Sequence, residues 1–275
     1  MTGKVCRILF GQALAGLALV GCNDADMPVA QPSARATASA TATPSPSATP
    51  IPAGARSISD ETDDFLFEYS YPAEAGNIPE FAALLDSRLT RMRDQLASQS
   101  AQAREDARGN GFPYNKYSIG MEWQTVADIP GYLSLSAEIS SYTGGAHGNF
   151  GFDSLVWDKE RAIALDPAAF FTSPEALDAA LKEPLCEHLQ AERAKRRGEE
   201  TEDAARGMFD ECVALADTTI LLGSKGGGKF DRIGVLIGPY VAGPWAEGTY
   251  EFTLPVNAAV MEAVAEPYRE AMSDR

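Results

Sequence analysis

The sequence predicts an α+β fold with helices packed on antiparallel sheets, and it allows a division into two lobes. Three observations support this prediction. Short segments with alternating apolar residues recur between residues 65 and 256, longer segments with a three- and four-residue apolar period separate them, and short turns typical of hairpins join neighbouring strands. Blocks of strands and helices arranged in this way favour an α+β architecture.

The first block begins with an aromatic strand. Aromatic residues occupy every second position from Phe65 to Tyr71, and Pro72 follows, which predicts a strand with one aromatic face. Apolar residues then recur along one stripe from Ile78 to Arg108, which predicts a long helix ended by the Gly-Asn-Gly that follows. Three further strands are expected at Tyr117–Ala127, Tyr132–Ile139 and Phe150–Asp158.

The second half contains helix and strand signals in turn. Ser173 and Pro174 are the cap and first-turn residues of a helix, which should kink or restart at Pro184. Another helix is expected at Ala205–Ala216. Strands are expected at Thr218–Leu222, Phe230–Ile237 and Tyr250–Val256, and a closing helix at Ala258–Ala271.

Residues 1–21 have the features of an export signal. Lys4 and Arg7 precede an apolar run over residues 8–20, which is shorter than the roughly 20 residues of a membrane-spanning helix and has the length of a signal-peptide core. The ending Leu19-Val20-Gly21-Cys22 resembles the lipobox of bacterial lipoproteins. This resemblance implies cleavage before Cys22 and lipidation of its thiol. An ordinary signal peptide or an uncleaved anchor is the alternative.

Residues 22–56 are expected to comprise the lipidated Cys22 and a disordered linker. From Pro28 to Ala55 the chain is mostly Ala, Ser, Thr and Pro without any aromatic residue, so it cannot bury enough surface to offset the entropy of ordering. In Gram-negative lipoproteins an Asp directly after the lipidated cysteine tends to retain the protein at the inner membrane. The resemblance therefore implies that Asn23 at this position favours the outer membrane. The sequence therefore predicts a protein of the cell envelope that is lipid-anchored and faces the periplasm.

The charge balance limits the partners. The chain has 39 acidic and 23 basic residues and a formal net charge of -16, which argues against nucleic acid because phosphate binding needs clustered Lys and Arg. An acidic surplus is usually a solubilising surface, and it can also steer a basic partner. Gly223, Gly228 and Lys229 have the spacing of a phosphate-binding loop, but Phe230 replaces the required hydroxyl residue and strands flank the run. We expect no nucleotide and no cofactor.

The cysteines offer one candidate pair. Cys186 and Cys212 remain after the signal cysteine is lost and Cys22 is lipidated, and an oxidising periplasm favours a disulfide between them, worth about 3 kcal/mol in the chain-entropy model. Free thiols are one alternative, and a metal site with His188 and Glu192 is another. Because Cys186 and His188 point to different faces of a helix, we expect no metal.

One glycine-rich loop is the candidate ligand contact. Its glycines permit positive φ and a close approach of another backbone, its His and Asn supply hydrogen-bonding groups, and its Tyr offers a flat apolar face. Such a loop could grip a sugar or a protein loop. The alternative is a tight connection whose His and Asn bond neighbouring backbone. The candidate residues are Tyr142, Thr143, Gly144, Gly145, His147, Gly148, Asn149 and, from a later loop, Tyr240.

These pieces resemble a known family. The aromatic strand ending in Tyr71-Pro72, the long helix, the loop from Tyr142 to Asn149, and the segments Ile237–Pro244 and Phe252–Pro255 are similar to the extracytoplasmic domain shared by RsiV-type lysozyme-sensing anti-sigma factors and the N-terminal part of PdaC-type deacetylases. The resemblance covers roughly residues 60–257. It implies a PdaC-like N-terminal lobe at residues 57–160 and an RsiV-like C-terminal lobe at residues 161–275.

The resemblance implies a binding module, and in the sensor branch that module binds lysozyme. We find neither a membrane-spanning helix for an anti-sigma factor nor a deacetylase domain, and we do not expect His147 and His188 to complete its Asp-His-His metal set. No G-x-S-x-G or H-E-x-x-H motif is present. We therefore expect a non-enzymatic periplasmic lipoprotein that binds a basic lysozyme-type protein or peptidoglycan. A glycan-acting enzyme with two carboxylates is one alternative, and a structural envelope lipoprotein is another.

Overall fold

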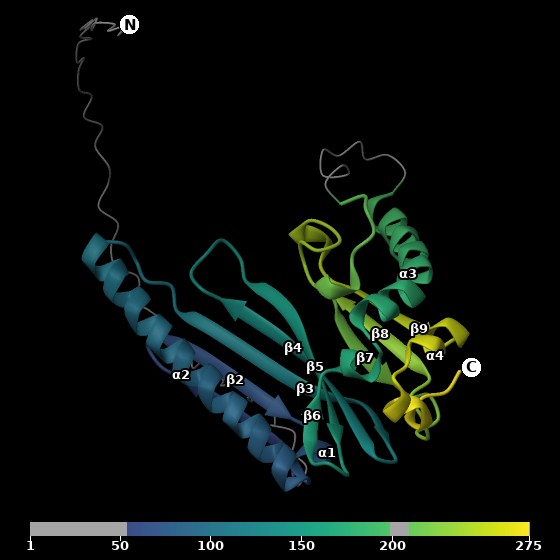
Figure 1. Cartoon of the computed structure of the whole chain (residues 1–275). Helices are drawn as coiled ribbons and strands as arrows, with labels where there is room; N and C mark the ends of the chain where they lie inside the picture. Colours follow the sequence, from purple (N-terminus) through teal and green to yellow (C-terminus); the bar gives the residue numbers. More distant parts are fainter. Residues whose placement is uncertain (1–53, 199–208, 275) are drawn as a thin grey trace, which may run out of the picture. The chain divides into compact units, whose positions relative to one another are not determined.

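The computed structural model describes residues 54–198 and 209–274, which contain two sheets (Figure 1). The first sheet has six strands in the order β1-β2-β3-β4-β5-β6, and the second has three in the order β7-β8-β9. Helices pack on both, so the predicted α+β fold is confirmed. The expected signal peptide, Cys22 and the linker up to residue 53 lie outside the described residues. Within the described part, no helix is both long and apolar enough to cross a membrane.

The elements of the first half are β1 (Arg56–Glu61), β2 (Phe65–Tyr71), α1 (Ala73–Gly76), α2 (Pro79–Asn110), β3 (Tyr117–Ile129), β4 (Tyr132–Tyr142), β5 (Asn149–Asp158) and β6 (Ile163–Leu165). The second half contains α3 (Pro174–Arg197), β7 (Thr219–Gly223), β8 (Arg232–Ile237), β9 (Tyr250–Pro255) and α4 (Ala258–Ala263). Short 3-10 helices lie at Pro167–Phe170, Leu215–Asp217, Trp245–Glu247 and Glu266–Ala271.

Helix α2 covers one face of the first sheet (Figure 1). Its buried residues follow one helical stripe and pack against the aromatic face of β2. Phe81 stacks on Trp157 with ring centroids 4.7 Å apart, and the Tyr69 hydroxyl donates to the Leu85 carbonyl at 3.2 Å. Gly111 ends the helix in the left-handed region, with φ of 71°. The predicted aromatic strand and long helix are both confirmed.

Strands β2 and β3 pair in parallel, although the sequence predicted antiparallel sheets. Helix α2 lies between them in the chain and returns it to the end where β2 began, so β3 runs in the same direction as β2. The sequence also missed β1, whose first residue, Arg56, was assigned to the linker. Strand β1 pairs antiparallel with β2 at the edge of the sheet. An edge strand needs little burial, and β1 contains only one large apolar residue, Ile58, so its sequence gives no clear strand pattern.

A β-bulge in β3 divides its side chains between two cores. Met121 and Trp123 pack in the core under α2. The register with β4 then shifts between Thr125 and Ala127, and Ala127 and Ile129 belong to the core of the second sheet. An extra residue in one strand reverses the face that the following side chains take. The first sheet therefore has α2 on one face and, beyond the bulge, the second core on the other.

Helix α3 supplies one wall of that second core. Its buried leucines recur every four residues from Leu177 to Leu189, and they pack with the inward residues of β7, β8 and β9. The Ser173 hydroxyl caps the helix by accepting from the Ala176 amide at 3.1 Å. The helix continues through Pro184 as one element, so of the expected kink or restart at this residue the restart does not occur.

Two predicted helices of the second half differ from the structure. The described part of the Ala205–Ala216 segment contains no α-helix and only the start of a 3-10 turn at Leu215–Asp217, for a reason given below. The closing helix expected to reach Ala271 ends at Ala263, and a 3-10 helix follows. Pro267 accounts for the break, because it has no N–H to donate to the carbonyl of Ala263, which accepts from the Thr172 amide at 2.8 Å instead.

Candidate functional site

The candidate loop meets a second loop in the structure. The connection between β4 and β5 contacts the segment between β8 and β9, and three aromatic side chains form the junction: His147, Tyr240 and Trp245, here called the aromatic latch. The rings of His147 and Trp245 stack with centroids 4.3 Å apart. Tyr240 contacts the imidazole through a hydrogen bond, with 3.2 Å between its hydroxyl oxygen and His147 Nε2.

Both nitrogens of His147 are engaged. Nδ1 lies 2.8 Å from the Gly148 carbonyl, which can only accept, so Nδ1 carries the proton and donates. In the neutral ring Nε2 then accepts from the Tyr240 hydroxyl. The Gly148 carbonyl also accepts from the Trp245 indole at 3.1 Å. These contacts combine both interpretations of the loop: His147 bonds neighbouring backbone, and it also holds a distant aromatic residue.

Tyr240 is exposed in an uncommon backbone conformation. Its side chain is 54% exposed, and its φ of 66° lies in the left-handed region, where a side chain other than glycine costs about 1–2 kcal/mol. On the facing loop, Gly144 has φ of 85°, and a Cβ at Gly148 would lie 3.0 Å from the Ser141 carbonyl. The junction thus keeps a strained aromatic residue facing solvent, an arrangement found at ligand-binding loops.

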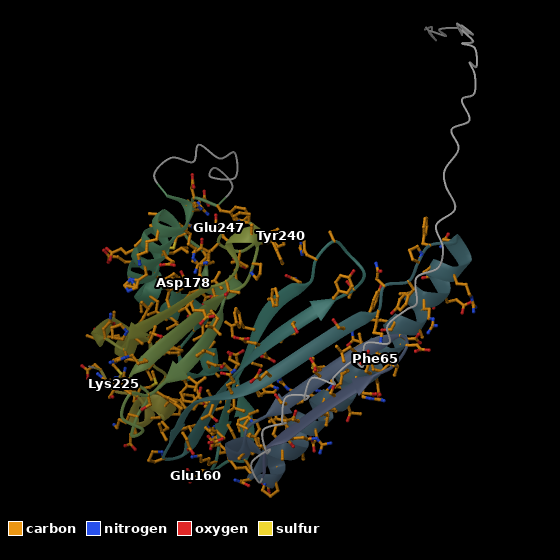
Figure 2. All side chains as sticks on the ribbon, turned by 180° about the vertical axis from the view of Figure 1, so that it is seen from behind. Phe65, Glu160, Asp178, Lys225, Tyr240 and Glu247 are labelled. Atoms are coloured by element: carbon orange, nitrogen blue, oxygen red, sulfur yellow. A yellow bond between two sulfur atoms is a disulfide. The ribbon has the colours of Figure 1, made fainter. Side chains whose placement is uncertain are left out.

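The loop that carries Tyr240 is supported by charged groups. Arg197 donates from Nε to Glu247 Oε1 at 2.8 Å, and the Tyr250 hydroxyl donates to the same carboxylate. Burial alone would raise the pKa of Glu247, but these hydrogen bonds outweigh it and hold the pKa below its ordinary 4.5. Burial and the Glu247 charge raise the pKa of Tyr250 to about 12. Figure 2 shows Tyr240 and Glu247 at the same end of the second sheet.

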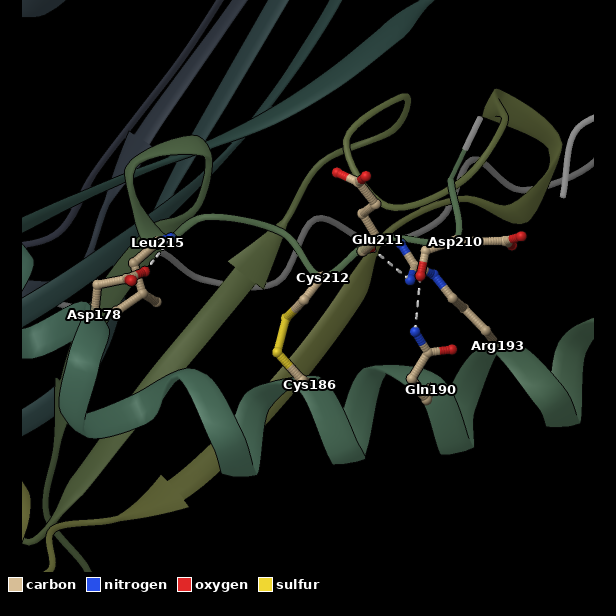
Figure 3. Close-up of a disulfide and its surroundings, with 8 residues drawn as sticks. All are labelled: Asp178, Cys186, Gln190, Arg193, Asp210, Glu211, Cys212 and Leu215. Carbon is tan, nitrogen blue, oxygen red and sulfur yellow. Dashed lines mark hydrogen bonds between the residues drawn. A yellow bond between two sulfur atoms is a disulfide. The ribbon is translucent and has the colours of Figure 1, made fainter. Parts of the chain in front are cut away.

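Residues 210–215 are tied to α3 by a disulfide and three hydrogen bonds (Figure 3). Cys212 is bonded to Cys186, Gln190 and Arg193 donate to the carbonyls of Asp210 and Glu211 at 2.9 and 3.0 Å, and the Leu215 amide donates to the Asp178 carboxylate at 3.1 Å. Side chains of α3 bond these carbonyls themselves, which explains why the described residues from 209 to 216 form no α-helix.

The metal site considered for these cysteines does not form, because the disulfide occupies both sulfur atoms. The ring of His188 lies edge-on to Phe252, with centroids 6.1 Å apart. Among residues 54–198 and 209–274, no three His, Cys, Asp or Glu side chains are grouped as metal ligands. The glycine-rich run after Gly223 joins β7 to β8 as a strand–turn–strand unit, as its sequence indicated.

A groove of about 600 Å³ lies on the face of the first sheet opposite α2, and we call it the acidic groove. It is lined by strands β1 to β5, by Gly248 and Thr249, and by β9. Its charged and aromatic lining residues are Glu68, Glu122, Glu138, Glu251, Tyr69, Phe150 and Phe152, and none of its described lining residues is Lys or Arg. Phe150 is 52% exposed.

The structure brings together only some of the candidate residues. His147, Gly148 and Tyr240 meet in the latch. Tyr142 ends β4, and Asn149 begins β5. In the described chain, no side-chain hydrogen bond links Thr143, Asn149 or either remaining glycine to the second loop.

Sequence reasoning missed Trp245, although an aromatic residue in a Gly- and Pro-rich loop is a usable signal. It also missed the groove glutamates, whose grouping depends on strand register.

Part of this sequence matches a protein family, and the fold is similar to solved structures. Residues 58–150 match the family model described as "Deacetylase PdaC". No curated protein matches the chain. A solved DUF3298 family protein from Pseudomonas aeruginosa PAO1 is similar with a TM-score of 0.52 and 13% identity, over 82% of this chain and 99% of that one. A DUF3298 family member from Bacteroides fragilis NCTC 9343 has a TM-score of 0.48 and 18% identity, over 80% and 96%. Residues 58–150 are therefore similar to a PdaC-type domain, and the chain shares its fold with a DUF3298 family protein.

Proposed function

We propose that this protein is a non-enzymatic lipoprotein of the cell envelope that binds a basic partner protein, with a lysozyme-type enzyme as the first candidate. One observation carries the proposal. The described residues expose four large hydrophobic side chains. One of them, Tyr240, belongs to the aromatic latch, and another, Phe150, lies at the start of β5, directly after the loop that carries His147. Exposed aromatic side chains on loops held in place by a rigid scaffold are typical of binding surfaces.

The charge of the chain supports a basic partner. The formal net charge is -16, and a field of this sign accelerates the approach of a cation and repels other acidic proteins. The partner would be held by contacts at the latch after electrostatic attraction brings it there. Binding would cover part of the partner's surface or sequester it near the membrane, so that this chain needs no catalytic group.

The anchor and the location belong to the same proposal. A lipid on Cys22 would hold the domain at the outer membrane on its periplasmic side. Replacing Cys22 with Ser removes the thiol that would be lipidated. We expect the variant to move from the membrane fraction to the soluble periplasmic fraction, and a variant that stays membrane-bound would contradict the lipid anchor.

Binding to a basic lysozyme tests the partner directly. We expect calorimetry with the soluble Cys22→Ser chain to show binding that weakens by about tenfold or more when salt is raised, because screening shortens electrostatic attraction. Tyr240→Ala should weaken binding at every salt concentration. Ile163→Ala is the matched control, because Ile163 is 40% exposed and pairs with Asp158, about 30 Å along β5 from Asn149. Absence of lysozyme binding at low salt would remove this candidate partner.

A glycan-acting enzyme is the second candidate, and a specific feature favours it. Glu122 and Glu138 lie directly opposite each other on β3 and β4 and line the same groove, where two aromatic side chains could contact a sugar ring. Two carboxylates flanking a bond are the minimum set for glycoside hydrolysis. Peptidoglycan turnover that is lost in both Glu122→Gln and Glu138→Gln would favour this function over binding alone.

A further inference from the structure

We propose that the acidic groove is the docking site for an extended basic segment of a protein partner, whose Lys or Arg side chains pair with Glu68, Glu122 and Glu138. The inference rests on the proposed function in one respect, which is that the partner is a basic protein. It adds a second contact surface, formed mainly by strands, with only Gly248 and Thr249 from a loop.

The groove exists because half of one sheet face is left uncovered. Buried residues alternate along β2 and early β3, and they point toward α2. The residues between them, Glu68 and Glu122, are exposed and point to the opposite face. Beyond the bulge, Ala127 and Ile129 carry that opposite face into the second core. The same face is thus covered at one end of the sheet and open at the other.

The acidic residues of the open half are neighbours across strands. Glu122 pairs with Glu138 on β4 and with Ser70 on β2, two residues from Glu68. Side chains directly opposite on adjacent strands have Cβ atoms about 5 Å apart, and like charges at such positions destabilise a sheet. A sheet that is optimised for folding alone would avoid this pair. A cationic ligand between the carboxylates would relieve the repulsion that the free protein retains.

No basic side chain of the described chain forms an ion pair with the groove glutamates. Neither Lys nor Arg forms an ion pair with Glu68, Glu122, Glu138 or Glu251 within residues 54–198 and 209–274, and the neutral Gln124 amide lies 3.5 Å from Glu122. In contrast, Asp153 on the α2 face of β5 is paired with Arg88 at 2.8 Å. The carboxylates of the groove are therefore available to a cation from another molecule.

The size and lining of the groove fit an extended chain. The lining crosses five strands, and four spacings of about 4.8 Å give a length of about 19 Å, enough for about six extended residues. Serine hydroxyls at Ser57, Ser70 and Ser140 offer polar contacts along this path. Phe150 and Phe152 form an aromatic wall that suits the aliphatic stems of Lys and Arg.

Two triple variants test the docking site with equal changes in net charge. The groove variant is Glu68→Gln/Glu122→Gln/Glu138→Gln. The control variant is Glu183→Gln/Glu262→Gln/Glu270→Gln, which changes exposed glutamates on α3, α4 and the last 3-10 helix. Both are made in the soluble Cys22→Ser chain, and binding of a basic lysozyme and of hexalysine is measured by calorimetry. Thermal unfolding of each variant shows whether it is folded.

We expect the groove variant to bind lysozyme and hexalysine at least about tenfold more weakly, and the control variant to change by about twofold or less through its net charge alone. The melting temperature of the groove variant should stay the same or rise, because cross-strand repulsion is removed. Hexalysine should shift the amide resonances of Gly120 and Gly151, two groove residues, in the unmodified protein.

The outcomes separate this inference from the proposed function. Equal lysozyme binding by the groove and control variants would overturn the docking site and leave the lysozyme partner in place. Hexalysine binding at the groove without lysozyme binding would support the site and remove lysozyme as its partner. Binding of neither lysozyme nor hexalysine would overturn the inference. Binding of soluble peptidoglycan fragments at the groove, without binding of hexalysine there, would overturn it as well.

Discussion

The imidazole of His147 stacks on the indole of Trp245 with ring centroids 4.3 Å apart, and the same indole donates to the Gly148 carbonyl at 3.1 Å. The indole and the carbonyl belong to residues 97 positions apart in the chain. The connection between β4 and β5 is therefore held by a loop from the second sheet, and its conformation depends on both parts of the fold.

His147→Ala should lower the free energy of unfolding by about 1–2 kcal/mol, because it removes an aromatic stack and two hydrogen bonds at a partly exposed site. Urea unfolding measures the change. His188→Ala is the control, because this exposed histidine takes no part in the latch, and we expect a change of about 0.5 kcal/mol or less. Equal effects of the two substitutions would show that the latch adds no stability.

Cys186→Ala/Cys212→Ala should lower the free energy of unfolding by about 3 kcal/mol, because the disulfide closes a loop with a sequence separation of 26. Thermal unfolding with and without a reducing agent measures this. The reductant should lower the melting temperature of the unmodified protein and leave that of the double variant unchanged. A double variant as stable as the oxidised protein would contradict a stabilising role for the disulfide.

Ala127→Asp should destabilise the protein by about 3 kcal/mol, because the bulge turns this residue, 6% exposed, into the second core, where a carboxylate has no partner. Thr125→Asp, on the same strand before the register shift, changes an exposed residue and should cost less than about 1 kcal/mol. Chemical denaturation of both variants measures the difference. Similar losses for the two would show that the bulge does not set the buried face.

Glu247→Gln should lower the free energy of unfolding by about 2 kcal/mol at neutral pH, because Arg197 and Tyr250 lose a charged acceptor. Folding lowers the pKa of this carboxyl, so the folded state binds fewer protons. Its contribution is present above the ordinary pKa of 4.5 and is lost as the pH falls through the lowered folded value. Denaturation at several pH values should show that the difference in the free energy of unfolding between the variant and the unmodified protein becomes smaller in acid.

A constant gap at all pH values would instead assign the effect of Glu247→Gln to packing rather than to charge. Glu262→Gln provides the control, because Glu262 is exposed on α4 and has no ion pair within the described part of the chain. We expect no gap between this variant and the unmodified protein at any pH.

Local patterns were enough to predict several elements. The period-two aromatics of β2 and the apolar stripe of α2 each identify a buried face, because burial repeats with the geometry of the element itself. Ser173 and Pro174 mark the start of α3 for a similar reason, since a helix start needs a cap and tolerates proline. In each case the signal and the structure that it predicts lie within a few residues.

Elements whose structure depends on distant partners were predicted less well. The segment before Cys212 has a helical pattern, but Gln190 and Arg193 of α3 bind its carbonyls and keep the described part irregular. The parallel pairing of β2 with β3 depends on the path of α2, which no local period reveals. Trp245 joins His147 only because the two sheets bring their loops together.

The sequence by itself determined that this chain forms an α+β domain rich in acidic residues, that it contains an aromatic strand and a long helix with one buried stripe, and that a glycine-rich loop holds His147. The tertiary structure decided which residues meet: Tyr240 and Trp245 at that loop, and Glu122 opposite Glu138 in an open groove. The reason is physical. Side-chain periodicity reports whether a residue is buried or exposed, whereas strand register and a single bulge decide which other residues share its face.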